Sequence, residues 1–393
     1  MGGGPAGVLL ATMLASQGLA VVVLESQKDF DRDFRGDTLQ PSALEILDDL
    51  GLLDLVLTLP HLKRSGAFSL GTTGDAVSID SGTLATRFPY SLTVSQARLL
   101  PLLVEHARRF SSFRLELGAR VTALVTEGEV VKGVTYVQAG AEHTLRAPLT
   151  IGADGRFSKV RELAGLTVES SSSPMDILWF RLPRAPDDPV ELSGPNAPQR
   201  MLLTINRHDH WQLGYIFPKD GIRDVKARGL PALREEIATL RPALASALEA
   251  LQSWKDTAVL SVQINRARTW HRDGLLLIGD AAHAMAPIGS VGISYAIQDA
   301  VCAAEVLVPR LKAGAVTRSD LARVQRLRER PTRLMQAFQA LAQRKLFEGT
   351  SAPGGGPARA LRWLPFLPRV LSWFIQLGPW RTRVVSLKSK RAA

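Results

Sequence analysis

The stretch Leu275-Leu276-Leu277-Ile278-Gly279-Asp280-Ala281-Ala282-His283 decides how the rest of this 393-residue chain is interpreted. Its first four residues predict a short buried strand that ends at a Gly and an Asp. A turn punctuated by glycines follows at 284–292, and residues 293–308 have the apolar periodicity of a helix. Asp accepts hydrogen bonds from sugar hydroxyls, while loop glycines and a helix N-terminus favour a negatively charged group. The stretch therefore predicts a site that binds a polar ligand.

A second nucleotide-binding signal lies near the start of the chain. Gly2, Gly4 and Gly7 fit the spacing G-x-G-x-x-G, and a helical pattern follows them as far as Gly18. Residues 20–24 then predict a buried strand that ends at Glu25. An acidic residue about 20 positions beyond the glycines is placed to bind a ribose hydroxyl, so the pattern indicates a dinucleotide site.

The strand that normally precedes such a glycine loop has no sequence in this chain, which begins at Met1 directly before the glycines. We therefore expect a parallel sheet without its first, central strand, with backbone groups left unpaired. The expected consequence is low stability or weak cofactor retention, which a sharp thermal transition with stoichiometric cofactor would contradict.

A third signal lies between the other two. Residues 149–152 predict a short strand, and Asp154-Gly155 after it is typical of a turn. Ser158 and Arg161, which follow, are able to cap a helix or bind a phosphate. An Asp-Gly pair alone is most often only a turn, so its weight comes from the other two motifs.

The three motifs together resemble the single-component FAD monooxygenases that are similar to p-hydroxybenzoate hydroxylase, and their order matches over residues 2 to about 310. The resemblance implies that the glycine loop binds the FAD pyrophosphate, Glu25 the adenosine ribose and Asp280 the ribityl chain. It implies NADPH or NADH as the co-substrate, with Asp154 and Arg161 linked to both nucleotides. The implied cofactor-binding residues are Gly2, Gly4, Gly7, Glu25, Arg35, Gln96, Asp154, Gly155, Arg161, Gly279, Asp280, Pro287, Gly289 and Gly292.

The chain departs from the family pattern at two positions beside the expected flavin ring. Ser290 stands where the family commonly has a second Gly, and Ser294 where it commonly has Asn. Both residues are small and polar, so flavin binding is expected to survive, while the fine placement of the ring depends on these two positions.

The expected fold class is α/β: a Rossmann-like FAD-binding domain with an inserted, mostly antiparallel β substrate domain and a C-terminal helical tail. We assign 1–66, 96–168 and 258–345 to the FAD-binding domain, and 67–95 and 169–257 to the substrate-binding domain. Residues 346–393 form a basic, aromatic-rich C-terminal segment. Strand-like alternation at 177–182 and 211–217 predicts the substrate side, with Trp179, Phe180, Trp211, Tyr215 and Phe217 as candidate lining residues. Because successive strand residues point to opposite faces of a sheet, not all five can line one pocket. For each of them, a place in the plain sheet core is an equally good interpretation.

As the resemblance implies, the expected function is an FAD-dependent monooxygenase, a hydroxylase or epoxidase that uses NAD(P)H and O2 through a flavin C4a-hydroperoxide. The apolar candidate lining favours a small hydrophobic substrate that is aromatic, quinone-like or a polyketide. No catalytic residue is assigned. The alternatives are an FAD-dependent reductase or dehydrogenase of the same superfamily, and a non-catalytic flavin-binding protein. A flavin-dependent halogenase is disfavoured because 211–218 does not fit W-x-W-x-I-P.

Bulk composition excludes several other classes. The lone Cys302 lies on an apolar helix and excludes an internal disulfide, and with no signal peptide this favours a reducing cytoplasm. No run of about 18 apolar residues is apparent. The motif His208-Asp209-His210 lacks a third ligand, so no metal is expected.

Much of the net charge of +11 comes from the C-terminal segment, which is basic from Arg359 onward and contains no acidic residue there. Nucleic-acid binding lacks a recognition motif, and we expect none. Interleaved aromatic residues leave two interpretations, a helical cap on the flavin domain and a peripheral contact with an anionic membrane, of which the cap is favoured. The oligomeric state is not indicated.

Overall fold

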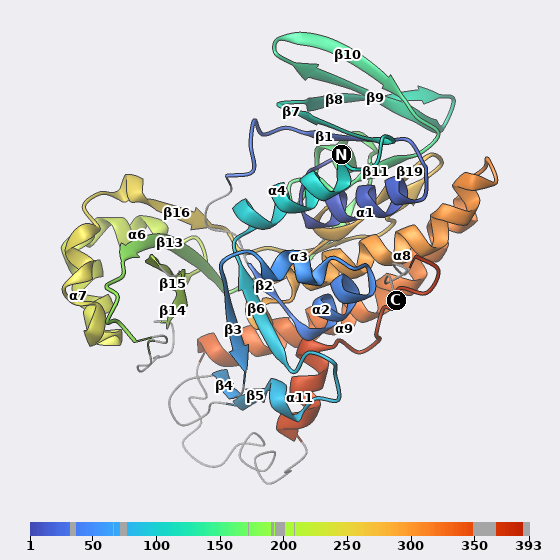
Figure 1. Ribbon diagram of the computed structural model, residues 1–393. Coiled ribbons are helices and arrows are strands. Elements are labelled where there is room, and N and C mark those ends of the chain that lie inside the picture. The colour runs from blue at the N-terminus through green and yellow to red at the C-terminus, as the bar shows by residue number, and fades with distance from the viewer. Residues whose placement is uncertain are drawn as a thin grey trace.

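The computed structural model describes residues 1–31, 37–65, 67–70, 77–171, 173–189, 192, 201–207, 209–348 and 367–387. Figure 1 shows a main body of helices packed on several small sheets. A four-stranded sheet, the second sheet, lies to one side with its covering helices. A three-stranded antiparallel sheet lies at the end of the main body that carries the N-terminus. Its strands are β8 (Arg120–Glu127), β9 (Val130–Gln138) and β10 (Ala141–Arg146).

The parallel strands of the main body form two separate ladders. In one, β1 (Val21–Glu25) pairs with β7 (Phe113–Leu117). In the other, β11 (Thr150–Gly152) pairs with β19 (Leu275–Leu277), and β18 (His271–Arg272) joins β19 in the antiparallel sense. Glu25 and the Gly279-Asp280 pair therefore both follow carboxyl ends of parallel strands, the edge of an α/β sheet where ligands bind.

Met1 and Gly2 lie between these two ladders. The Met1 nitrogen donates to the Ile151 oxygen at 2.7 Å, and Ala153 N donates to the Met1 oxygen at 2.7 Å. Gly2 N donates to the Leu24 oxygen at 2.8 Å. Among the described residues, these backbone contacts lie between β1 and β11, where we expected the central strand to be missing. The expected effect on cofactor retention stays a prediction.

Two long helices form the centre of the main body. Helix α1 (Pro5–Ser16) begins with Pro at its first turn and is buried on nearly every side, packed against α8 (Gly292–Lys312) and α4 (Gln96–Ala107). The segment Ile288–Lys312 is long and apolar enough to span a membrane, contrary to the sequence-based expectation. However, 78% of its apolar window is buried inside the protein, so α8 serves as a core helix.

The second sheet has the strand order β14-β15-β13-β16 and is antiparallel throughout. Its strands are Met201–Asn206 (β14), His210–Pro218 (β15), Met175–Pro183 (β13) and Thr257–Leu260 (β16). The predicted strands at 177–182 and 211–217 are confirmed. In the register, Trp179 lies opposite Gly214. Both faces of this sheet are buried, one against α7 (Gly229–Leu240) and the other toward the main body.

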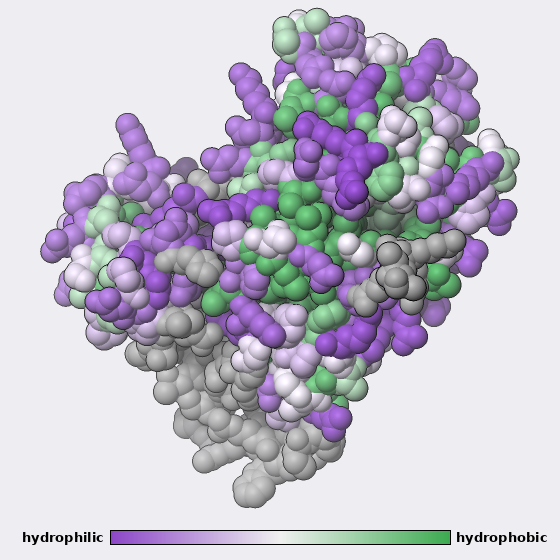
Figure 2. Space-filling model, in the orientation of Figure 1, coloured by the Kyte–Doolittle hydropathy of each residue, from purple (hydrophilic) through white to green (hydrophobic). Residues whose placement is uncertain are grey.

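The remaining elements complete the main body and the layer of the second sheet. They are the strands β2 (Thr38–Leu39), β3 (His61–Ser65), β4 (Ala67–Leu70), β5 (Val77–Asp80), β6 (Tyr90–Val94), β12 (Val168–Ser171), β17 (Ile264–Ala267) and β20 (His283–Ala284), and the helices α2 (Pro41–Asp49), α3 (Leu53–Leu57), α5 (Lys159–Leu163), α6 (Ile222–Ala227), α9 (Arg318–Glu348) and α11 (Leu367–Gln376). Figure 2 shows a mostly hydrophilic surface on the viewed side, with hydrophobic residues gathered over the region of α2, α3 and α4.

Candidate active site

The glycine loop has no room for side chains. Gly2 has φ +94°, and a Cβ atom there would lie 2.3 Å from the Ala153 oxygen. A Cβ at Gly7 would lie 2.0 Å from the Gly2 oxygen. The backbone of this loop is therefore bare where it meets the N-terminus of α1, whose N-cap Gly4 provides no side-chain cap. An uncapped helix N-terminus behind a bare backbone fits a pyrophosphate.

Glu25 ends β1 and is buried. Its Oε2 accepts a hydrogen bond from Gly3 N at 2.7 Å, and its Oε1 accepts one from Gln27 N at 2.9 Å. A carboxylate has further acceptor sites beyond these two bonds, and ribose hydroxyls are donors. The strand-end carboxylate is thus fixed against the glycine loop in an orientation that suits a ribose.

Arg161 connects the Asp-Gly motif with the later Gly-Asp motif. Its Nη1 donates to the Ala281 oxygen at 2.8 Å, and its Nη2 donates to the Arg156 oxygen at 2.9 Å. Asp154 accepts hydrogen bonds from Ser158 Oγ at 2.6 Å and from Val160 N at 3.0 Å, which fixes the turn before α5. The structure therefore brings the second and third sequence motifs into contact.

The Gly-Asp turn is held between two helices. Gly279 has φ +58°, and a Cβ there would lie 3.3 Å from Ala6 Cβ on α1 and 3.4 Å from Ala296 Cβ on α8. The Asp280 side chain, in contrast, keeps 32% of its surface exposed, with Arg156 Nη2 3.6 Å from its Oδ2. Asp280 is therefore accessible to a ligand, while its neighbour is locked in the core.

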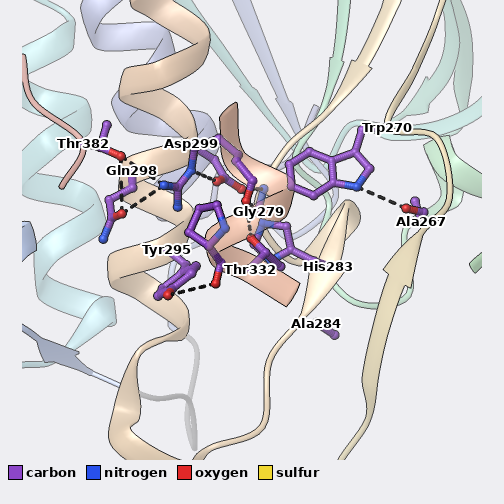
Figure 3. A network of polar contacts seen from close by, with 12 residues as sticks. Ala267, Trp270, Gly279, His283, Ala284, Tyr295, Gln298, Asp299, Thr332 and Thr382 are labelled. Carbon is purple, nitrogen blue, oxygen red and sulfur yellow. Dashed lines mark hydrogen bonds and ion pairs between the residues drawn. The ribbon is translucent and has the colours of Figure 1, made fainter. Parts of the chain in front are cut away.

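A buried polar network fixes this turn (Figure 3). Asp299 of α8 is fully buried and accepts hydrogen bonds from Gly279 N at 2.9 Å, His283 Nε2 at 2.6 Å and Arg328 Nε at 2.7 Å. Burial by itself raises the pKa of this carboxyl, but attraction to His283 and Arg328 outweighs burial and holds the pKa below its ordinary value. Arg328 Nη1 continues the network to Thr382 Oγ1 at 3.0 Å.

The 287–292 loop lies at the N-terminus of α8 and carries Gly289 at φ 78°. Two glutamines that sequence reasoning missed hold its backbone. Gln339 of α9 donates to the oxygens of Ala286 and Ile288 at 2.8 Å each, and Gln40 donates to the Gly289 oxygen at 2.8 Å. Isolated glutamines carry no sequence signal of this kind, because their partners lie 51 to 249 residues away.

Gln96, at the start of α4, is buried next to Asp37. Its backbone N donates to Asp37 Oδ1 at 3.2 Å, and the other carboxylate oxygen of Asp37 forms an ion pair with Arg207. Burial raises the pKa of Asp37 to about 6, although Arg207 acts against that rise. This pair joins the main body to the β14–β15 turn, and no sequence motif predicts it. Arg35 lies outside the described residues.

The structure separates the five candidate lining residues. Phe180, Trp211, Tyr215 and Phe217 lie on the face of the second sheet that packs against α7, in the core of that layer. Trp211 Nε1 donates to Asp188, and the Tyr215 hydroxyl donates to Glu236 at 2.8 Å. These four are therefore sheet core and do not face the 287–292 loop.

Only Trp179 of the five lies on the other face, which we call the cofactor-side face. Its apolar members cluster with Ala286 and Ile288, next to and within the 287–292 loop. The alternation that separates Trp179 from Phe180 was visible in the sequence, but which face meets the loop was not. The buried apolar residues of this face are Met175, Ile177, Trp179, Met201 and Ile216, and β15 also places Gln212 and Gly214 on it.

Comparisons with known proteins show the family to which the chain belongs. Residues 1–336 match the family model described as FAD binding domain. A 6-methylpretetramide 4-monooxygenase from Streptomyces rimosus is 36% identical over 317 residues, which cover 79% of this chain and 75% of the relative. A rifampicin monooxygenase from Streptomyces venezuelae is 30% identical over 76% of this chain, which spans 61% of that relative's length.

Among solved structures, OxyS anhydrotetracycline hydroxylase from Streptomyces rimosus has a TM-score of 0.78 at 21% identity. The match covers 97% of this chain and 76% of that one. At this identity the likeness concerns the fold alone, and it extends over nearly the whole chain.

Proposed function

The chain belongs to the FAD binding domain family, and together with its relatedness to named monooxygenases this makes it an FAD-dependent monooxygenase, whose substrate we propose is a flat, hydrophobic aromatic or polyketide molecule. NAD(P)H is the co-substrate. Its relatives include monooxygenases named for 6-methylpretetramide and for rifampicin. The observation in this chain that supports the substrate class is the apolar cofactor-side face, which packs toward the 287–292 loop.

The chain's residues suit the positions that FAD requires. The bare glycine loop and the α1 N-terminus would hold the pyrophosphate, Glu25 a ribose and Asp280 the ribityl chain. When bound, FAD supplies the redox chemistry by accepting electrons from NAD(P)H and passing them to O2. Arg161 ties the two later motifs together, so it would set the position of Asp280 relative to the cofactor.

The protein's contribution to oxygenation is to hold its groups still and to exclude water. The 287–292 loop suits that task because Gln40 and Gln339 bind its carbonyl groups and the one before it, leaving the backbone little freedom. The N-terminus of α8 directly follows the loop and favours negative charge there.

An isotope experiment tests the proposal. Purified holoenzyme with NAD(P)H and a panel of hydroxylated anthraquinones and naphthols is expected to consume O2 in step with NAD(P)H for at least one member. In ¹⁸O2, that product should gain a single labelled oxygen atom. NAD(P)H oxidation without O2 consumption would indicate a reductase instead. If no panel member accelerates NAD(P)H consumption, the proposed substrate class is contradicted.

The C-terminal helix supports the cap interpretation. In α11, Ile375 is buried, and its Cγ2 would lie 3.0 Å from a Cβ at Gly289, so the helix packs directly behind the 287–292 loop. Trp373 and Trp380 remain 40% and 51% exposed, so a peripheral membrane contact stays a prediction beside the cap. Flotation with anionic liposomes at low and high salt would test the membrane contact. Cell fractionation would test the predicted cytoplasmic location.

A further inference from the structure

The cofactor-side face has an apolar end and a polar end. Ile177, Met201 and Ile216 pack toward Ala286 and Ile288. Further along the strands, the same side of the sheet carries Gln212 of β15, and Arg207 lies just beyond β14. Trp179 lies between the two ends, and β13 places it on the same side as both.

Trp179 has a buried donor without a partner. The residue is only 6% exposed, and among the described residues its Nε1 finds no hydrogen-bond acceptor. Two other buried tryptophans are satisfied: Trp211 Nε1 donates to Asp188 and Trp270 Nε1 donates to the Ala267 oxygen. A buried N–H without an acceptor is unfavourable, so its persistence here calls for an external acceptor.

The indole of Trp179 lies across Gly214. A Cβ at Gly214 would come within 2.9 Å of Cζ3 and 3.0 Å of Cη2 of that ring. The ring thus fills the space that any side chain at 214 would need, and the glycine lets it lie against the strand. A flat aromatic surface of this kind suits stacking with a flat substrate.

Gln212 supplies a second donor without a partner. Its Oε1 accepts from Arg207 Nε at 2.8 Å and also from Arg207 Nη2. Since a guanidinium only donates, the amide oxygen must face Arg207, and the NH2 group must therefore point the other way. That Nε2 is buried and finds no partner within the part of the chain that the structure describes.

The two donors belong to one patch. In the β13–β15 register Trp179 pairs with Gly214 and Arg181 pairs with Gln212, so Trp179 and Gln212 are diagonal neighbours on one face. Such neighbours are about 7–8 Å apart, within reach of long side chains. Two guanidinium groups lie near Gln212, because Arg181 is close enough to act electrostatically on Arg207. Because Asp37 already pairs with Arg207, the patch favours an oxygen acceptor mainly through its two N–H donors.

We propose that Trp179 Nε1 and Gln212 Nε2 bind an oxygen atom of the substrate, a ring carbonyl, enolate or phenolate oxygen, and so determine specificity for oxygenated ring systems. This rests on the proposed function, because it takes the cofactor-side face as the substrate side. Asp37 and Arg207 act here as positioning residues, since Asp37 holds Arg207 and Arg207 orients the Gln212 amide.

The test compares two ring-matched probes, 1-naphthol and naphthalene, bound to holoenzyme without NAD(P)H. Dissociation constants come from the change in the flavin absorbance spectrum. Wild type is expected to bind 1-naphthol more tightly than naphthalene by about tenfold or more, the size of one good hydrogen bond. Trp179→Phe keeps a ring but removes the N–H, and Gln212→Glu keeps the acceptor for Arg207 but removes the donor. Each should reduce the preference for 1-naphthol and leave naphthalene binding nearly unchanged.

Trp211→Phe is the matched control, because it removes a partnered N–H from the opposite face of the same sheet, and it should leave the preference intact. The proposal is overturned if wild type shows no preference, or if Trp179→Phe and Gln212→Glu keep it or weaken both probes equally. The ¹⁸O2 experiment separates this result from the proposed function. Oxygenation that persists with an unchanged preference in Trp179→Phe would retain the monooxygenase and reject the donor pair.

Discussion

At the scale of single residues, Asp299 is the group on which the Gly-Asp turn depends. It joins α8, α9 and the turn through three hydrogen bonds, and it is the counter-charge of fully buried Arg328. Removing one member of a buried ion pair leaves the other uncompensated, which is costly. The residue therefore supports the position of Asp280 without touching the ligand itself.

The variant Asp299→Asn tests this role. We expect the free energy of unfolding to fall by about 3 kcal/mol or more, because Arg328 loses its counter-charge in the core. Urea denaturation followed by circular dichroism measures it. Arg310→Gln is the control on the same helix, where the partly exposed pair with Asp320 should contribute only about 0–1 kcal/mol. An equal loss in both variants would show that Asp299 has no special part in holding the turn.

Asp280→Ala tests the cofactor assignment. The folded protein should lose FAD affinity by about tenfold or more, as expected when a charged acceptor for cofactor hydroxyls is removed. Fluorescence titration of the apoprotein with FAD measures the dissociation constant. Asp224→Ala, an exposed position on α6, should leave it unchanged. A variant at position 280 that retains FAD as tightly as wild type would remove Asp280 from the site.

At this scale, sequence patterns predict sites from residues that are close along the chain and miss pairs that meet only in the folded protein. Spacing along the chain predicted a glycine loop with Glu25 beyond it, and the structure packs Gly2 and Gly7 tightly and places Glu25 against Gly3, while their cofactor roles stay predictions. Gln339 and the Asp37–Arg207 pair were invisible because such contacts form only once the whole chain is folded.

At the scale of elements, α11 shapes the loop that it packs behind. Ile375 forms one apolar cluster with Val291 of the 287–292 loop and Tyr295 of α8. Basic and aromatic composition suggested either a cap or a membrane contact. The buried face of α11 supports the cap interpretation. The sequence alone could not decide between a cap and a membrane contact, because the amphipathic pattern is the same for both.

Ile375→Ala is expected to create a cavity behind Gly289. Large-to-small changes in a core cost about 2–5 kcal/mol, and the loop should also loosen. Thermal unfolding measures the stability, and the visible circular dichroism of bound FAD reports the loop. Trp373→Ala on the exposed side of α11 should change neither property. If both variants behave alike, α11 does not support the loop.

The second sheet shows what alternation can and cannot predict. Its strand positions and the opposite directions of Trp179 and Phe180 were correct. Because both faces of this sheet are buried, hydrophobicity could not tell which face meets the cofactor side. Four of the five candidate aromatics lie in the sheet core against α7, which is the alternative that the sequence left open, while Trp179 stays a candidate.

At the scale of the whole molecule, the Asp37–Arg207 pair joins the main body to the second sheet. Burial raises the pKa of Asp37 from 3.8 to about 6. Since the folded state then binds this proton more tightly than the unfolded chain, the contribution of Asp37 to stability falls as pH rises from 3.8 to about 6. Above that range the contribution is constant.

Asp37→Asn should therefore abolish one pH dependence. The stability of wild type relative to the variant is expected to decrease between pH 4 and pH 6.5 by roughly 2–3 kcal/mol, because each tenfold change in proton affinity corresponds to about 1.36 kcal/mol. Chemical denaturation across this range measures it. The groups near the pair are Arg181, His210 and Asp209, so His210→Gln controls for titration of the histidine. A difference that is flat with pH would contradict the assignment.

Among the residues that the structure describes, the backbone hydrogen bonds that connect the two parallel ladders directly are those of Met1 and Gly2, while side chains of both ladders pack in one apolar core. Local opening varies in free energy across a structure, and we predict that few direct backbone hydrogen bonds between the ladders let them open with different free energies. In deuterium-exchange mass spectrometry, peptides that cover β1 and β7 should therefore lose protection at a different rate from peptides that cover β11 and β19. The two ladders would then open relative to each other at the Met1–Gly2 contact beside the nucleotide site, and the rate of this opening would limit cofactor exchange.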